Sequence, residues 1–122
     1  MPIDVACLCA AWCQLCGSYA AVFAHVTAEL AARGHDLRPH WIDIEDESEL
    51  VGDLDIETFP TLVVVDPVAV RFAGVLTPQP ETLRRILRAT VAEAPAAASW
   101  SAVDAEFLAF ADRLRKRLGR TG

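Results

Sequence analysis

The stretch "ACLCAAWCQLC", residues 6–16, contains all four cysteines of the chain and the boundary between two predicted elements. Residues 3–9 are predicted to form a short strand with Ile3, Val5, Cys7 and Cys9 on one face, because successive side chains of a strand point to opposite faces. From Cys13 to residue 32 apolar residues recur at helical spacing, which predicts a helix. Cys13 and Cys16 therefore lie where a strand gives way to a helix.

The rest of the chain continues to alternate strands and helices. Its patterns predict strands over 38–44, 61–65 and 68–72 and helices over 47–54, 78–91 and 101–118. A strand–helix–strand start followed by a hairpin predicts an α/β fold, with a four-stranded mixed sheet flanked by helices. We expect residues 1–94 to form one domain. Residues 95–122 are expected to supply a linker and an amphipathic helix that packs on this domain or on a second subunit.

Composition and charge narrow the classes of function. The chain has 122 residues, 53% of them hydrophobic, and a formal net charge of −6. Neither Lys nor Arg occurs between residues 39 and 70, whereas the last 40 residues carry eight of the 11 basic side chains. The acidic stretch is interpreted as a solvated face or a surface that attracts a basic partner. No nucleic-acid partner is expected, because no nucleic-acid motif accompanies the basic tail.

Residues 5–24 contain no charged side chain and need to be weighed as a membrane segment. No basic residues precede this stretch, as they would in a signal peptide. Gln14, Gly17 and Ser18 interrupt the apolar run, which falls short of the roughly 18 residues of a spanning helix. We therefore expect a cytoplasmic protein without a membrane partner. In that compartment, close cysteines are more often catalytic or metal-binding than structural.

Two motifs in this order carry a resemblance to a known family. Trp12-Cys13-Gln14-Leu15-Cys16 has the pattern W-C-x-x-C at the start of the predicted helix. Phe59-Pro60-Thr61 follows, with Pro60 44 residues beyond Cys16, directly before the apolar strand "TLVVV". Over about residues 3–91 the chain resembles thioredoxin-like proteins. The resemblance implies a thioredoxin fold and thiol–disulfide exchange.

The resemblance also implies residue roles. Cys13 corresponds to the attacking cysteine and Cys16 to the resolving one. Pro60 corresponds to the family's cis-proline, the backbone of Phe59 would pair with a bound substrate chain, and Trp12 would help to shape the substrate groove. The implied partners are disulfide-containing protein substrates and an electron donor of the thioredoxin-reductase type, and no cofactor is expected.

Residue chemistry supports the same roles independently. Only a thiolate attacks a disulfide. Cys13 lies at a predicted helix start, where unpaired backbone N–H groups and the helix dipole stabilise negative charge. Cys16 lies one helical turn later and can reach back to resolve a mixed disulfide.

The sequence also departs from the family pattern. The chain starts at the strand that leads into the W-C-x-x-C motif, where the usual member has an additional strand and helix before it. Cys7 occupies the place of a buried Asp, Cys9 that of an aromatic residue, and Trp41 that of a Lys. Without the acid and the Lys, we expect slower exchange, because a thiol is mostly protonated at neutral pH.

Cys7 and Cys9 allow three interpretations. A buried free cysteine behaves as a small hydrophobic residue. Both are alternatively auxiliary redox residues, with Cys7 exchanging a disulfide with Cys16. The spacing C-x-C-x3-C-x2-C also contains one zinc-type C-x2-C pair but lacks a second well-spaced pair, so no metal is expected. The alternatives to a reductase are therefore a binding or redox-sensing module with weak turnover, or a four-cysteine metal-binding protein.

We expect the predicted last helix to compensate for the first strand and helix of the usual family member. Without them, the strand at 38–44 would be a bare sheet edge and one sheet face would be thinly covered. Val103, Phe107, Phe110 and Leu114 form an apolar stripe at helical spacing. We expect this stripe to cover the sheet face or to form a homodimer interface.

Overall fold

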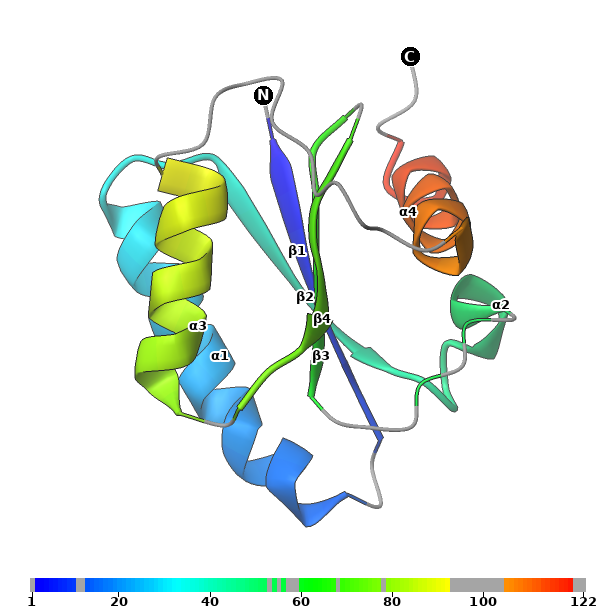
Figure 1. The fold of residues 1–122 in the computed structure, drawn as a ribbon, viewed down its shortest axis with the longest axis horizontal. Coiled ribbons are helices and arrows are strands. Elements are labelled where there is room, and N and C mark those ends of the chain that lie inside the picture. Colours follow the sequence, from blue (N-terminus) through cyan, green and yellow to red (C-terminus); the bar gives the residue numbers. More distant parts are fainter. Residues whose placement is uncertain are drawn as a thin grey trace.

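The sheet has the mixed four-stranded topology predicted from the sequence. A computed structural model describes residues 2–10, 13–52, 54, 56, 60–67, 69–77, 79–92 and 105–119. Its strands are β1 (Ile3–Cys9), β2 (Leu37–Asp43), β3 (Thr61–Val65) and β4 (Val70–Val75), in the spatial order β2-β1-β3-β4 (Figure 1). β1 pairs in parallel with β2 and antiparallel with β3, which pairs antiparallel with β4. In the described residues, β2 is an edge strand, as expected.

Helices cover both faces of the sheet, which completes the predicted α/β architecture. α1 (Gln14–Ala32) and α3 (Pro80–Leu87) lie on one face, and α2 (Ser48–Val51) and α4 (Ala105–Arg117) lie on the other (Figure 1). A π-helical turn, η1 (Arg88–Ala92), continues α3. The predicted helix at 78–91 is thus an α-helix followed by a wider turn.

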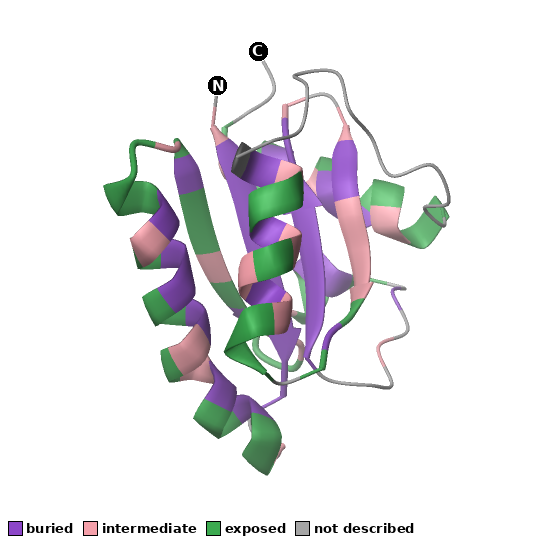
Figure 2. Cartoon of the chain, turned by 60° about the vertical axis from the view of Figure 1, so that its left-hand side comes forward, coloured by how far each residue is buried: buried purple, intermediate pink, exposed green. Residues whose placement is uncertain are grey.

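β1 is the central element and is buried along its whole length. Figure 2 shows the inner strands buried while the outward surfaces of α1 and α3 remain exposed. Because side chains alternate along a strand, Val5, Cys7 and Cys9 enter the apolar core beneath α1 and α3. Ala6 and Leu8 enter the second core, beneath α4. All four thiols therefore lie on the α1 side.

α1 is a core helix with one buried face. By length and composition alone it is also apolar enough to cross a membrane. Its buried residues recur at helical spacing and pack against the sheet: Cys16, Tyr19, Phe23, Val26, Thr27 and Leu30. The Thr27 hydroxyl donates a hydrogen bond to the Phe23 carbonyl at 2.8 Å, which satisfies the polar group inside the core.

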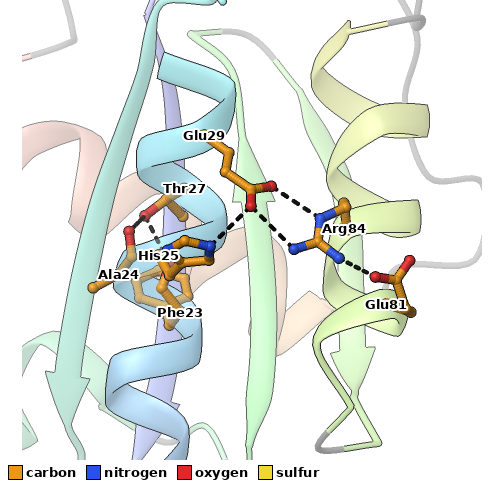
Figure 3. Close-up of polar contacts among 7 residues, drawn as sticks. All are labelled: Phe23, Ala24, His25, Thr27, Glu29, Glu81 and Arg84. Carbon is orange, nitrogen blue, oxygen red and sulfur yellow. Dashed lines mark hydrogen bonds and ion pairs between the residues drawn. The ribbon is translucent and has the colours of Figure 1, made fainter. Parts of the chain in front are cut away.

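An ion-pair network joins α1 to α3 on the outer surface (Figure 3). The Arg84 guanidinium donates two hydrogen bonds to Glu29, at 2.9 and 3.1 Å, and also pairs with Glu81. His25 lies 2.9 Å from the same Glu29 carboxylate. Arg84 lowers the pKa of Glu29, and their contact links the two helices that cover the core containing the thiols.

α4 packs against the sheet of its own chain. Phe110, Ala111 and Leu114 are buried in the second core, and Phe107 is partly buried against it. Arg113 donates to the Leu50 and Val51 carbonyls, both at 2.7 Å. The described part of the predicted stripe thus covers the sheet face within one chain. Val103 and the domain boundary at 94–95 lie outside the described residues, and a homodimer remains a prediction.

The hairpin after β3 differs from the prediction. β4 begins at Val70 and continues to Val75, rather than covering 68–72, and its register shifts between Val64 and Val65. Asp66 organises the turn: its carboxylate accepts a hydrogen bond from the Ala69 N–H at 2.6 Å and pairs with the buried Arg71 at 2.8 Å. Because this buried pair holds the turn together, β4 begins two residues later than predicted. Hydropathy alone does not reveal such a pair.

Candidate thiol site

The site forms where β1 ends and α1 begins. The Cys13 N–H donates to the Ala10 carbonyl at 3.0 Å, which turns the chain, and Cys13 is the N-cap residue of α1. The Ile44 N–H donates to the Cys9 carbonyl at 2.9 Å, so the end of β2 is tied to the same place. The predicted helix from Cys13 therefore begins one residue later, with Cys13 at its cap.

The Cys13 sulfur faces the open N-terminus of α1. Its side chain makes no conventional capping hydrogen bond. The backbone N–H groups of Cys16, and to a smaller extent Leu15, nevertheless lower the pKa of the Cys13 thiol, against the opposing effect of burial. All four cysteines are free thiols, and Cys13 is the partly exposed one. It is therefore the accessible sulfur that is easiest to ionise.

Cys16 has the opposite environment one turn later. It is only 2% exposed. Burial raises the pKa of the Cys16 thiol, and a hydrogen bond with the Cys9 thiol raises it further. The pair thus combines one accessible thiol that favours the thiolate with one protected thiol that favours the protonated form.

Cys7 and Cys9 continue the row of sulfurs into the core. Both are buried. The Cys9 thiol lies near the thiols of Cys7 and Cys16; the interaction with Cys7 is the main reason that the pKa of Cys9 is raised, followed by burial. The sulfur found in contact with Cys16 is that of Cys9, whereas the sequence interpretation named Cys7 as its exchange partner.

Tyr19 is a neighbour that the sequence interpretation treated only as helix packing. Its hydroxyl is buried and has no hydrogen-bond partner among the described residues. Burial raises the pKa of the Tyr19 phenol, and nearby Cys7 and Cys9 add to the rise. The available signal was its position: Tyr19 follows Cys16 by three residues and so shares its helix face.

A shallow hollow opens beside Cys16, between α1 and β2. It has a volume of about 200 Å³, and its lining includes Cys16, Gly17, Trp41 and Asp43. Trp41 is 40% exposed, and its ring centroid lies 5.9 Å from that of Phe23. Asp43 is the carboxylate in this hollow, a position that the sequence interpretation did not single out.

The predicted substrate-groove residues are only partly described. Pro60 is buried, and its carbonyl accepts a hydrogen bond from the Leu76 N–H at 3.0 Å. Because Thr61 pairs with Leu8, Pro60 lies at the same end of the sheet as Cys9. Trp12 and Phe59 lie outside the described residues, so their predicted contacts with substrate stay predictions.

Side chains of the metal-binding types do not gather in the part of the chain that the structure describes. Within the described residues, no three His, Cys, Asp or Glu side chains are placed to hold one ion. His40 instead pairs with Asp4 at 2.9 Å, near the opposite end of β1 from Cys9. The four thiols instead neighbour one another in the order Cys13, Cys16, Cys9 and Cys7, which we call the row of thiols.

Several solved structures of thioredoxins superpose on this chain. Deadhead, a germline-specific thioredoxin from Drosophila melanogaster, superposes with a TM-score of 0.63 over 74% of this chain and 82% of its own, at 16% identity. Fasciola hepatica thioredoxin superposes with a TM-score of 0.62 over 73% and 81%, also at 16% identity. This chain has a thioredoxin-like fold. Oxidised thioredoxin O1 from Arabidopsis thaliana superposes at 0.60 over 74% and 78%, with 20% identity.

Comparison of sequences adds nothing to this likeness. No family model and no curated protein matches the chain. The thioredoxin-like fold is therefore recognised from the superposed structures rather than from overall sequence similarity.

Proposed function

We propose that this chain is a thiol–disulfide oxidoreductase that reduces protein disulfides through Cys13 and Cys16. The observation that carries the proposal is the contrast between the two thiols. Cys13 is partly exposed and faces backbone N–H groups that favour its thiolate, whereas Cys16 is buried one turn away. Thioredoxins among the structural neighbours support this chemistry at the level of the fold.

The reaction follows from the two environments. The Cys13 thiolate attacks one sulfur of a substrate disulfide, and the other substrate sulfur leaves with the electron pair and takes a proton from solvent. Cys16, once deprotonated, attacks the Cys13 sulfur and releases the second substrate thiol. The substrate gains two electrons, and the chain retains a Cys13–Cys16 disulfide that an external dithiol donor must reduce.

The proposal includes the setting implied by the family resemblance. Protein disulfides would be the substrates, and a cytoplasmic donor of the thioredoxin-reductase type would return the electrons. Trp12, Phe59 and Pro60 would line the groove that receives the substrate chain. The acidic stretch between residues 39 and 70 would favour substrates with basic surfaces.

Insulin reduction driven by dithiothreitol tests the proposal. We expect the wild-type chain to accelerate insulin precipitation, and Cys13→Ser and Cys16→Ser each to return the rate to that of dithiothreitol alone. Ser18→Ala is the matched control, because Ser18 is exposed on the same helix two residues beyond Cys16. Equal rates for the wild type and Cys13→Ser would contradict the assignment.

A binding or redox-sensing module with weak turnover is the second candidate. Cys7, which is fully buried, stands where the family resemblance expects an acid, and this favours slow resolution. In that case the wild type would accumulate a mixed disulfide with substrate as strongly as Cys16→Ser does. A reductase would accumulate it only in Cys16→Ser, which gel electrophoresis without reducing agent distinguishes.

A further inference from the structure

The row of thiols extends beyond the pair used in the proposed function. The Cys16 thiol lies near Cys9 on its inner side and near Cys13 on its outer side, and both thiols raise its pKa. Cys9 is 1% exposed and belongs to the same core cluster as Cys7 and Cys16. The Cys9 sulfur therefore needs no approach from solvent to reach Cys16, although its raised pKa makes the attacking thiolate the minor form.

Tyr19 supplies a second observation at the same place. A buried hydroxyl without a hydrogen-bond partner destabilises the folded state. The Tyr19 hydroxyl is such a group in the described part of the chain. Cys7 and Cys9 lie close enough to raise the pKa of its phenol. A thiolate that forms at Cys9 would attract this hydroxyl, which has no other partner among the described residues.

We propose that Cys9 is a second exchange partner of Cys16, so that the disulfide formed at Cys13–Cys16 moves inward to Cys9–Cys16. This inference rests on the proposed function for the origin of the first disulfide. The Cys9 thiolate attacks the Cys16 sulfur, the new Cys9–Cys16 bond forms, and the Cys13–Cys16 bond breaks. The electron pair leaves with Cys13, the proton lost by Cys9 goes to solvent or to Cys13, and no net oxidation occurs.

The direction of this exchange follows from the helix start. A thiol with a lower pKa leaves faster and is more stable when reduced. Inward movement is favoured because Cys13 is the N-cap residue of α1, where backbone N–H groups stabilise a thiolate, whereas Cys9 lies within the buried strand β1. The accessible thiol is restored while the oxidation is held in the core, which hinders re-oxidation of the reduced substrate.

The test uses Cys13→Ser, in which the outer pair cannot form. The reduced variant is treated with diamide, which removes two electrons and two protons from a thiol pair, and is then quenched in acid, alkylated and mapped by peptide mass spectrometry. We expect Cys9 and Cys16 to be recovered as one disulfide and Cys7 as an alkylated thiol. Only free thiols, or a disulfide from Cys7 to Cys16, would overturn the inference.

Two double variants form a matched pair, because each removes one buried thiol from β1. Cys13→Ser/Cys9→Ala should lose the disulfide, whereas Cys13→Ser/Cys7→Ala should keep it. Cys13→Ser/Tyr19→Phe should form it several-fold more slowly. Loss of the disulfide in the Cys7→Ala background but not in the Cys9→Ala background would contradict the assignment of Cys9.

A time course with the wild type guards against variants that fail to fold. After one turnover with insulin, the Cys13–Cys16 disulfide should decline while Cys9–Cys16 grows and Cys13 again becomes alkylatable. A disulfide that stays at Cys13–Cys16 would overturn the inference. An inner disulfide in Cys13→Ser, together with no insulin reduction by the wild type, would instead contradict only the proposed function.

Discussion

Cys13 and Cys16 show how position alone gives one side-chain type two different reactivities. The first faces helix N–H groups and is accessible, and the second is enclosed by the sheet and another thiol. The W-C-x-x-C spacing predicted the helix start at Cys13 and the one-turn separation of Cys16, because both are local features, but it did not predict the burial of Cys16. The contact between Cys9 and Cys16 is not local in this sense, since it depends on how far α1 lies from β1.

The lowered pKa of Cys13 predicts its pH-dependent alkylation. A lowered pKa means that the thiolate is still present below the ordinary thiol value of about 8.5 and is lost as the pH falls through the shifted value. Iodoacetamide should therefore modify Cys13 in the native reduced protein with a midpoint below that value. Cys7, Cys9 and Cys16 should stay unmodified until the protein unfolds. Mapping over a pH series checks both statements, and a midpoint above 8.5 would contradict the role of the helix start.

Asp43 is expected to assist the resolving step. Cys16 must lose a proton, burial raises its pKa, and Asp43 lines the same hollow. Asp43→Asn keeps the oxygen that accepts hydrogen bonds from the Glu45 and Asp46 N–H groups, so the turn should persist. We expect insulin reduction to slow by about three- to tenfold, on the scale of general base catalysis or less.

Asp46→Asn is the matched control for this prediction, because Asp46 is exposed and is not among the residues that line the hollow. Its rate should equal that of the wild type. Equal effects of the two substitutions would mean that loss of charge on this acidic surface, rather than proton transfer at Cys16, controls the rate.

Among the elements, we expect the packing of α4 against the sheet to matter most for the free energy of unfolding. Phe110 is fully buried against the sheet, whereas Leu108 on the same helix is 50% exposed. Phe110→Ala should lower the free energy of unfolding by about 3–5 kcal/mol, through lost burial and the cavity left behind. Leu108→Ala should change it by less than about 1 kcal/mol. Urea unfolding measures both, and similar values would contradict the packing of α4 seen here.

Periodicity predicted which elements exist better than it predicted where they end. β1 and β3 have their predicted bounds, because continuous apolar runs fix a central strand. The start of β4 was wrong by two residues, since the Asp66–Arg71 pair and the register shift arise only when the hairpin closes. Trp41, at the edge, is held against Phe23 by a contact between two elements that no local pattern contains.

For the molecule as a whole, the order of elements determined the topology. A parallel pair followed by a hairpin leaves few arrangements of four strands, and the observed sheet is one of them. The sequence left open whether the last helix covers its own sheet or a second subunit. Its basic side chains help to answer this, because Arg113 and Arg115 donate to backbone carbonyls of the same chain.

Removal of residues 99–122 tests whether the whole molecule needs α4 to cover its sheet. The deletion would expose the apolar face formed by Ala6, Leu8, Val63 and Val65 beside an edge strand. We expect aggregation or loss of cooperative unfolding, measured by light scattering and thermal denaturation. A chain that ends at residue 119, and so retains α4, is the control; a well-folded monomer without residues 99–122 would contradict the structural role of the helix.

The central claim is that Cys13 and Cys16 form the first disulfide when the protein reduces a substrate. The most direct measurement mixes the reduced protein with one equivalent of insulin, quenches it in acid within the first turnover, and maps every disulfide by mass spectrometry. Our account predicts that the earliest disulfide joins Cys13 to Cys16, with Cys7 and Cys9 still reduced. An earliest disulfide that excludes Cys13, or insulin that stays oxidised while all four thiols stay free, would contradict it.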